Sequence, residues 1–307
     1  MNMSEYKTIE HIVMLVGQKN VMHKKALSNS FKECSQEYLQ ICEEYLSNYI
    51  RFLYDIKGMD LNRVVNAYLK MVEEVVREQV YFKSNGVYRY TSFKDVCDKV
   101  YYSLEYMFDY MIGLAISQYL WKNHRDFFLF FTKIISKQNG ENYLEIGPGH
   151  GLFFLEAVQN GNFKKYVAID LSETSIDMCK SLLQYNNNFD RTKVEFIHCD
   201  VYGYESENLF DFITIGEVME HIEEPERLVS KTYNLLREKG EVFITTCINC
   251  PMIDHIYHFK SMEDIRDILY RFNFKIINEI VLPSENVNLD DAIKQKTTIN
   301  YACLLKK

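Results

Sequence analysis

The stretch YLEIGPGHG, residues 143–151, decides the fold. Its first five residues, YLEIG, form a short apolar run that is typical of a buried strand. Glycines then recur at Gly147, Gly149 and Gly151, where they let the backbone pass close under a ligand and present amide donors at the start of a helix. The stretch therefore predicts a strand, a ligand-binding turn and a helix beginning near residue 151.

Downstream of this turn, short apolar runs alternate with helical patterns. The predicted buried strands are YVAIDL (166–171), VEFIHCD (194–200), FDFITIG (210–216) and EVFITTC (241–247). Helical patterns near 151–160, 173–186, 225–238 and 261–272 separate or follow them. Strands alternating with helices indicate an α/β fold, a parallel sheet with helices on both faces. The last two runs, FKIINEIVL (274–282) and TINYACLL (298–305), are consecutive strands and predict an antiparallel terminal pair.

Upstream of the turn, the chain lacks helix breakers. All four prolines and eight of the twelve glycines lie after residue 139, so residues 1–137 are predicted to be mostly helical. Helices are expected over 36–57 and from Ser92 through to Leu120. Two more are expected with capping residues: one that begins after Asp60, and one over 125–136 with Asn123 as its cap. The prediction is a helical unit, 1–137, followed by an α/β unit, 138–307.

Composition excludes several classes of protein. The chain has 307 residues and a formal net charge of -8, with no block rich in lysine and arginine, so DNA and anionic membranes are not expected as partners and RNA is disfavoured. No run approaches the roughly 18 to 20 apolar residues that span a bilayer. The eight cysteines are scattered, which favours reduced thiols and a cytoplasmic location.

Two acidic residues follow the glycine turn at informative positions. Asp170 ends the second predicted strand, nineteen residues after Gly151, where a carboxylate can accept both ribose hydroxyls of a nucleotide. Asp200 ends the third strand and precedes Val201, a placement suited to an adenine amino group beside an apolar wall.

With these residues, positions 141–307 resemble the class I S-adenosylmethionine-dependent methyltransferases. The segments LEIGPGHG, AIDLS, HCDV and GEVMEHIEEP occur in that family's order. The resemblance implies a Rossmann-like sheet of seven strands in the order 3-2-1-4-5-7-6, mostly parallel, with an antiparallel last strand. It also implies S-adenosylmethionine as the cofactor, bound over the carboxyl ends of strands one to four.

The resemblance implies that the glycine turn holds the methionine part of the cofactor. Glu145, Gly147, Gly149 and Gly151 would surround it, with the loop amides near its carboxylate.

The remaining cofactor positions implied by the resemblance follow the next three strands. Asp170 would hold the ribose, Leu171 and Val201 would sandwich the adenine, and Asp200 would bond its amino group. Glu217 would border the reacting sulfonium. A positive sulfonium favours a site lined by carboxylates, carbonyls and aromatic faces.

Two short motifs raise the question of a metal. Glu217, Glu220 and His221 resemble the segment of ubiquinone-pathway O-methyltransferases and the E-x-x-E-H metal site of small-RNA 2′-O-methyltransferases. The favoured interpretation is metal-free, with Glu220 and His221 as polar groups at a helix start that shape the pocket. Cys247 and Cys250 form a lone C-x-x-C without a second pair, so zinc is not expected.

Candidate groups for the acceptor side come from three segments. The loop after strand five contains DHIYHF, residues 254–259, which is rich in groups that can move a proton. His221, His255 and His124 are the candidate bases or acceptor-positioning residues. The alternative for the loop side chains is that they cap the helix beginning near Ser261.

Tyrosines gather in one part of the helical unit: Tyr88, Tyr90, Tyr101, Tyr102, Tyr106, Tyr110 and Tyr119, with Trp121 nearby. An aromatic stripe is usually core, but many phenols are costly to bury without partners. The hypothesis is that the helical unit folds over the carboxyl edge of the sheet as a lid.

The predicted function is transfer of a methyl group from S-adenosylmethionine to an O or N nucleophile of a small-molecule acceptor. Two alternatives stay open: cyclisation of the cofactor with release of methylthioadenosine, and an inactive cofactor-binding module. Association into a homodimer also stays open.

Overall fold

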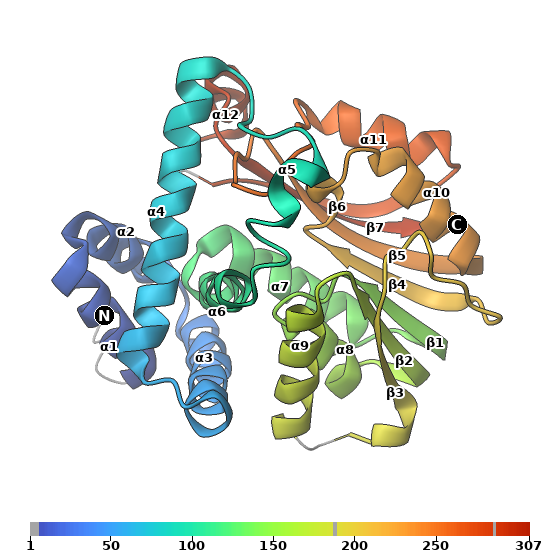
Figure 1. Ribbon diagram of the computed structural model, residues 1–307, viewed down its shortest axis with the longest axis horizontal. Helices are drawn as coiled ribbons and strands as arrows, with labels where there is room; N and C mark the ends of the chain where they lie inside the picture. The colour runs from blue at the N-terminus through green and yellow to red at the C-terminus, as the bar shows by residue number, and fades with distance from the viewer. Residues whose placement is uncertain (1–5, 187–188, 285–286) are drawn as a thin grey trace.

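A computed structural model describes residues 6–186, 189–284 and 287–307 (Figure 1). Its N-terminal part is helical, as the scarcity of breakers predicts. The helices are α1 (Lys7–Lys19), α2 (Val21–Lys32), α3 (Gln36–Lys57), α4 (Leu61–Asn85), α5 (Phe93–Cys97), α6 (Leu104–Leu120) and α7 (Lys122–Ile135). No helix in these ranges is long and apolar enough to cross a membrane.

The C-terminal part contains one sheet whose strand order is β3-β2-β1-β4-β5-β7-β6. Its strands are β1 (Asn139–Ile146), β2 (Asn162–Asp170), β3 (Val194–His198), β4 (Phe210–Gly216), β5 (Leu236–Ile248), β6 (Lys275–Pro283) and β7 (Ile299–Lys306). Pairing is parallel from β3 to β5, while β7 runs antiparallel to both β5 and β6. The fold class and the strand order implied by the resemblance are confirmed.

Helices cover both faces of this sheet (Figure 1). They are α8 (Leu152–Asn160), α9 (Glu173–Asn186), α10 (Pro225–Leu235), α11 (Met262–Arg271) and α12 (Leu289–Gln295). One face packs its aromatic side chains against α7, α8 and α9, and the other packs branched aliphatic side chains against α10, α11 and α12. Along each strand, successive side chains point to opposite faces, and apolar side chains on both faces are typical of a sheet that is buried on both sides.

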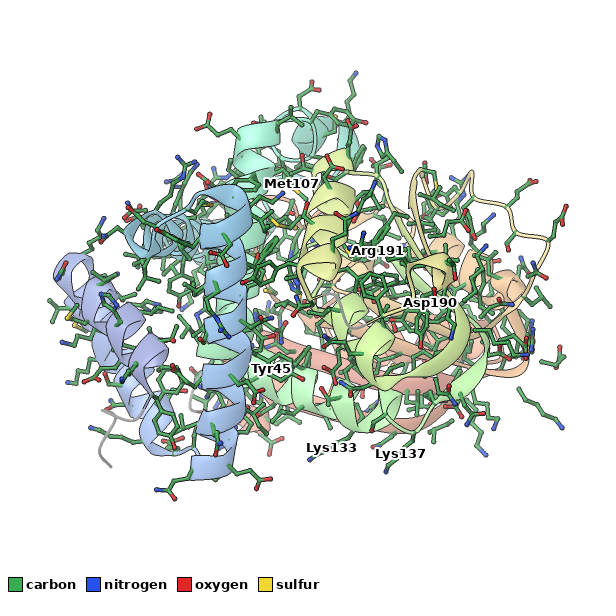
Figure 2. All side chains as sticks on the ribbon, turned by 90° about the horizontal axis from the view of Figure 1, so that it is seen from below. Tyr45, Met107, Lys133, Lys137, Asp190 and Arg191 are labelled. Atoms are coloured by element: carbon green, nitrogen blue, oxygen red, sulfur yellow. The ribbon has the colours of Figure 1, made fainter. Side chains whose placement is uncertain are left out.

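The helical part and the sheet share a hydrophobic core. Phe131 of α7 lies 5.1 Å from Phe243 of β5 and 4.9 Å from Phe153 of α8, ring centroid to centroid. Tyr45 of α3 faces the sheet-bearing part, where its hydroxyl donates to Glu156 at 2.8 Å (Figure 2). The change near residue 137 therefore marks a change of secondary structure inside one continuous core.

Several predicted boundaries need correction. The helix expected from Ser92 to Leu120 is interrupted between α5 and α6, and the Ser92 hydroxyl donates to the Asp95 carboxylate and makes no capping bond to the backbone. Asn123 lies inside α7, which begins one residue earlier. The cap at Asp60 is confirmed, because its carboxylate accepts the Arg63 amide at 2.8 Å.

Two strand boundaries and one helix also differ from the prediction. Strand β3 ends at His198, two residues before Asp200, and β5 begins at Leu236, which shortens α10. The acidic stretch between β6 and β7 contains α12, whose cap is Asn288.

Candidate active site

A cavity of about 550 Å³ lies at the carboxyl ends of the central strands. The α/β part lines it from the turns after β1, β2, β3, β4 and β5, and the helical part lines it from α4, α5, α6 and α7. The predicted site residues that line it are Glu145, Gly147, Gly149, Asp170, Leu171, Asp200, Val201, Glu217, His221, His255 and His124. The fold thus brings residues of the helical part and of the α/β part to one site.

Gly151 is the predicted cofactor residue that does not line this cavity. A Cβ atom at Gly151 would lie 2.8 Å from the Cα atom of Cys179, and its φ is 81°. Its role in the structure is to allow close packing of the start of α8 against α9. A Cβ atom at Gly147, with φ 70°, would lie 2.7 Å from Val218 Cγ2, so this position also requires glycine.

The carboxylate of Asp170 closes the turn from the side of β2. It accepts the Ser172 amide at 2.8 Å and the Gly149 amide at 3.3 Å. Burial raises the pKa of Asp170 to about 6, although these amide bonds act in the opposite direction. The side chain is therefore an anionic acceptor near neutral pH and loses that capacity in mild acid.

Glu145 is fully buried beneath the same turn. Its carboxyl accepts a hydrogen bond from the Tyr143 hydroxyl at 2.7 Å. Burial raises the pKa of Glu145 to about 8, with the negative charge of Asp170 contributing further. A buried group of this kind favours a cationic ligand, because a positive charge nearby stabilises its ionised form.

The turn after β3 adds residues that sequence reasoning missed. Asp200 accepts the Tyr202 amide at 2.9 Å, which fixes the turn, and Arg227 of α10 stacks 4.0 Å from the Tyr202 ring centroid. Tyr202 and Arg227 both line the cavity beside Val201. Neither belongs to the quoted motifs, and only the fold brings α10 next to this turn.

Glu217 follows β4 in a strained conformation, with φ 52°. Its amide donates to the Thr245 hydroxyl at 3.0 Å, while its Oε1 atom has no hydrogen-bond partner within the described part of the chain. Burial, together with the charge of Glu220, raises the pKa of Glu217 well above its ordinary value. A buried carboxylate oxygen without a partner is available to a ligand in the cavity.

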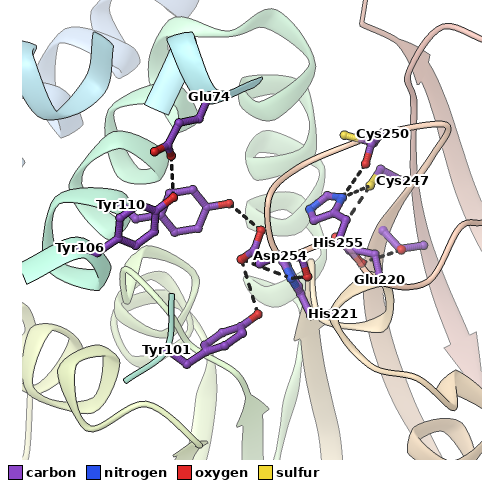
Figure 3. A network of polar contacts seen from close by, with 11 residues as sticks. Glu74, Tyr101, Tyr106, Tyr110, Glu220, His221, Cys247, Cys250, Asp254 and His255 are labelled. Carbon is purple, nitrogen blue, oxygen red and sulfur yellow. Dashed lines mark hydrogen bonds and ion pairs between the residues drawn. The ribbon is translucent and has the colours of Figure 1, made fainter. Parts of the chain in front are cut away.

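A network of polar contacts around Asp254 forms another part of the cavity wall (Figure 3). Asp254 is 2% exposed and accepts hydrogen bonds from Tyr110 at 3.0 Å and Tyr101 at 3.4 Å. His221 Nδ1 lies 3.0 Å from the Asp254 carbonyl oxygen and 3.4 Å from its carboxylate. The helical part therefore holds, through two phenols, the carboxylate that orients His221.

Tyr110 is held in place by a neighbouring tyrosine, Tyr106. Tyr106 stacks on Tyr110 with 5.8 Å between ring centroids and donates to Glu74 of α4 at 2.5 Å. Tyr101, Tyr110 and Trp121 line the cavity, whereas Tyr102 is exposed and Tyr119 is in the core. Of the seven tyrosines singled out in the sequence, two reach the cavity and Tyr106 supports one of them.

His255 lies in a different polar cluster beside β5. Its Nδ1 atom is 3.6 Å from Cys247 Sγ and 2.6 Å from the Cys250 carbonyl oxygen (Figure 3). A hydrogen bond from Cys247 lowers the pKa of Cys250 to about 5, with His255 contributing. Burial disfavours the charged imidazole, but bonding to Cys250 raises the pKa of His255 to about 10. His255 is thus bonded to the Cys250 carbonyl beside the Cys247 sulfur, and its ring packs edge-on against His221 with 4.7 Å between ring centroids.

His124 and its neighbour His150 form the third polar group. His124 Nδ1 lies 3.0 Å from the Ser117 hydroxyl, and burial lowers the pKa of His124 to about 4. Burial, together with His124, lowers the pKa of His150 to about 3. Both imidazoles are neutral at physiological pH, which suits hydrogen bonding to a ligand better than proton removal. His150 lies within the glycine motif but had no predicted role.

Comparison with known proteins places this site in a family. A sequence model described as a methyltransferase domain matches residues 117–279, more than half of the chain. The ubiquinone biosynthesis O-methyltransferase of Coxiella burnetii is 27% identical over 133 residues, which is 42% of this chain and 53% of that protein. The enzyme of the same name from Neisseria meningitidis is 30% identical over 113 residues, 36% of this chain and 46% of that protein. The chain spans about half the length of the curated relatives it matches.

Solved structures share the fold. The N-methyltransferase NodS from Bradyrhizobium japonicum, in complex with S-adenosyl-L-homocysteine, aligns with a TM-score of 0.53 at 15% identity, over 67% of this chain and 97% of that one. Phosphoethanolamine N-methyltransferase 2 from Haemonchus contortus, in complex with S-adenosyl-L-methionine, aligns with a TM-score of 0.52 at 18% identity, over 70% of this chain and 60% of that one. With the strand order and the family match, the resemblance seen in the sequence is confirmed: the chain belongs to the class I S-adenosylmethionine-dependent methyltransferase family.

Proposed function

We propose that this protein transfers a methyl group from S-adenosylmethionine to an O or N nucleophile of a small-molecule acceptor. The observation that carries the proposal is a cavity that joins the glycine turn and its acidic residues to the His221 and Asp254 network. A volume of about 550 Å³ falls within the range of sites that enclose a small ligand.

The residues at the first end of the cavity fit this cofactor. The turn at Gly147 and Gly149 exposes backbone, Asp170 offers a carboxylate for the ribose, and Asp200 and Val201 flank the position for adenine. Glu145 and Glu217 are buried carboxyls whose raised pKa values favour the neutral form, and a cation bound nearby would favour their ionised forms. When bound, the cofactor supplies an electrophilic methyl group on a positively charged sulfur.

At the second end, His221 is the proposed base. With Nδ1 donating to Asp254, the Nε2 atom is left as the proton acceptor. It removes the proton from the acceptor's hydroxyl or amine as the new bond to carbon forms. Asp254 and its two tyrosines act as positioning residues, because they orient the imidazole and stabilise its charged form. His255 and His124 line the same space and position the acceptor.

The cavity wall favours an acceptor that is neutral or positively charged. Among the described residues that line it, Arg227 is the one guanidinium and no lysine is present, while Glu217, Glu223 and Asp254 contribute carboxylates. Apolar and aromatic side chains cover much of the remainder. The curated relatives are named for O-methylation and the structural neighbours for N-methylation, so both nucleophiles belong to the proposal.

Within this proposal, residues 1–137 serve as the lid and substrate part, and residues 138–307 bind the cofactor. Gln79 of α4, Phe93 of α5 and Tyr110 of α6 contribute to the cavity wall. The Phe93 amide donates to the Glu223 carboxylate at 2.8 Å, which ties α5 to the loop after β4. This cover excludes water from the reacting groups. We expect the protein to work in the cytoplasm, where its eight free cysteines would stay reduced.

The fate of the cofactor tests the proposal. The full chain is incubated first with S-adenosylmethionine alone and then with pools of neutral and cationic hydroxyl or amine compounds, and products are identified by mass spectrometry. S-adenosylhomocysteine that appears only with an acceptor supports methyl transfer. Methylthioadenosine from the cofactor alone would indicate cyclisation instead, and no thermal stabilisation by the cofactor would indicate an inactive module.

A further inference from the structure

A cysteine pair and a histidine lie together at the end of β5, outside the residues that the proposed methyl transfer uses for proton removal. Cys247 is inside β5 and is 2% exposed. Asn249, with φ 50°, turns the chain sharply so that Cys250 lies beside the strand end. His255 comes from the loop that follows and is 5% exposed.

This loop is held by backbone and side-chain bonds on several sides. The Asn249 amide donates to the Phe259 carbonyl at 3.1 Å, and the Thr298 hydroxyl donates to the Asn249 carbonyl at 3.0 Å. The amides of Ile256 and Tyr257 both donate to the Glu220 carbonyl, at 2.9 Å and 3.0 Å. The three side chains are therefore presented by a fixed scaffold, as a preorganised site requires.

The donor atoms have the spacing of a metal site. The sulfur atoms of Cys247 and Cys250 and a ring nitrogen of His255 all lie within 4.8 Å of one another. Cys247 Sγ and His255 Nδ1 are 3.6 Å apart. With Zn–S and Zn–N bonds of ordinary length, the edge between sulfur and nitrogen in a tetrahedral site is about 3.6 Å.

We propose that Cys247, Cys250 and His255 bind a zinc-type divalent cation. Two thiolates and one imidazole are the donors that zinc prefers over magnesium or calcium. Burying the negative charge of two thiolates is unfavourable, and a bound cation offsets that free-energy cost. The sequence predicts no zinc site, because the C-x-x-C motif has no second pair of ligands. The fold, however, places His255 beside the two cysteines as a third ligand.

Glu220 borders the fourth coordination position. Its Oε1 atom lies 3.9 Å from Cys247 Sγ, and its Oε2 atom accepts the Thr246 hydroxyl at 2.7 Å, which fixes the carboxylate (Figure 3). Cys250 and His255 also line the cavity, so the position lies at the wall of the cavity. Binding at His255 Nδ1 displaces the proton that this atom shares with the Cys250 carbonyl, as metal binding to imidazole requires.

Cobalt is the probe that tests this site, because tetrahedral Co²⁺ bound to thiolate has intense visible bands and a thiolate-to-metal charge-transfer band. The full chain is produced without a metal-binding tag, freed of metal under reducing conditions and titrated with Co²⁺. We expect both bands to saturate at one cobalt per chain and to disappear when Zn²⁺ is added. Cys247→Ser and Cys250→Ser should each lose the charge-transfer intensity of one sulfur and bind more weakly.

Cys34→Ser is the matched control, since Cys34 is a half-buried thiol that donates to the Ser30 carbonyl far from the cluster in sequence. It should leave the cobalt spectrum unchanged. Bands of full intensity in both Cys247→Ser and Cys250→Ser, or no tetrahedral spectrum in the parent chain, would overturn the proposal.

A second measurement does not depend on whether the variants fold. In the parent chain, Zn²⁺ should protect Cys247 and Cys250 from alkylation, mapped by mass spectrometry, while Cys34 reacts equally with and without Zn²⁺. Equal labelling of the pair in both conditions, or a Cys247–Cys250 disulfide in freshly purified reduced protein, would contradict metal binding. Neither measurement involves S-adenosylmethionine, so the metal site and the methyl transfer can fail separately.

Discussion

His221 is the residue on which the proposed chemistry depends most. It lines the cavity, and its Nδ1 atom faces the carbonyl and carboxylate of Asp254. We predict that His221→Gln lowers kcat by about 10²- to 10⁴-fold, the usual contribution of a general base, and changes the Kd for S-adenosylmethionine little. Steady-state kinetics and calorimetric titration measure the two quantities.

His258→Gln is the matched control in the same segment of chain. Its imidazole bonds to the Asn249 side chain at 2.8 Å and does not line the cavity, so kcat should be near that of the parent. A loss of kcat in His258→Gln equal to that in His221→Gln would mean that the loop tolerates no histidine replacement and that His221 has no special role.

Asp254→Asn tests whether this carboxylate positions the base. An amide in place of the carboxylate no longer stabilises a charged imidazole, so we predict a lower kcat with little change in the Kd for S-adenosylmethionine. Tyr110→Phe removes one of the hydrogen bonds to Asp254 and should have a smaller effect in the same direction. An unchanged kcat in Asp254→Asn, or a loss of cofactor affinity equal to the loss of kcat, would contradict the positioning role.

Asp170 gives a prediction for cofactor binding. Its pKa is raised to about 6, so the carboxyl is ionised above that pH and protonated below it. The affinity for S-adenosylmethionine should therefore fall as the pH drops through 6. Asp170→Asn should bind at least about tenfold more weakly at neutral pH, because hydrogen bonds to a charged acceptor contribute roughly 1.5–3 kcal/mol.

The same variant tests the cause of the pH dependence. Calorimetry on either side of pH 6 should find a clear change of affinity in the parent chain and a smaller one in Asp170→Asn. Equal pH dependence in the two proteins would assign the titration to another group in the cavity.

At the residue scale, local motifs predicted one end of the cavity and missed much of the other. Asp170 is the last residue of β2 and Asp200 lies two residues after β3, so their positions along the sequence predict that they share an edge of the sheet. The contact between Tyr110 and Asp254 joins residues 144 positions apart. No local pattern encodes such a contact, because it depends on how α6 packs against the loop after β5.

At the scale of elements, the turn from β1 into α8 is the most constrained. Gly147 has φ 70°, and a Cβ atom there would lie 2.7 Å from Val218 Cγ2. Gly147→Ala should lower the free energy of unfolding by at least about 1–2 kcal/mol, the cost of a left-handed conformation with a side chain. It should also weaken cofactor binding, because the turn must shift.

Urea unfolding with Gly203→Ala as the control checks this prediction. Gly203 is not in the left-handed region, and a Cβ atom there would meet its nearest neighbour at 3.6 Å. The control should differ little from the parent chain. If Gly147→Ala were as stable as Gly203→Ala, the turn would be more adaptable than its geometry implies.

Strands could be predicted from the sequence where their side chains are buried on both faces of the sheet. The strands of the sheet are continuous apolar runs, and they were recognised within a few residues. The break between α5 and α6 was missed, since residues 98–103 contain neither glycine nor proline. The structure ends α5 there because Phe93 and Tyr101 stack on each other with 5.4 Å between centroids and line the cavity, a tertiary contact that overrides local helix preference.

At the scale of the whole molecule, the shared core predicts cooperative unfolding. Trp121, the single tryptophan, lies between α6 and α7 and reports on the helical part, while far-ultraviolet circular dichroism reports on the whole chain. Because Phe131 packs against Phe243 of the sheet, the two transitions in urea should coincide. Separate midpoints would mean that residues 1–137 unfold as an independent domain.

The sequence predicted the change from helices to alternating strands near residue 137, and the resemblance implied the strand order. The sharing of the core across this boundary was not predictable, because the aromatic faces of α7 and of the sheet have no local signature that pairs them. The family match, which begins at residue 117, likewise crosses the boundary.

The most direct test of the central claim follows the methyl group itself. The full chain is given S-adenosylmethionine carrying a deuterated methyl group, together with a pool of neutral and cationic small molecules, and the products are analysed by mass spectrometry. The proposal predicts that the labelled methyl appears on an oxygen or nitrogen of one acceptor, in equal amount to S-adenosylhomocysteine, and that His221→Gln binds cofactor but transfers little label. Methylthioadenosine formed without any labelled acceptor would contradict it.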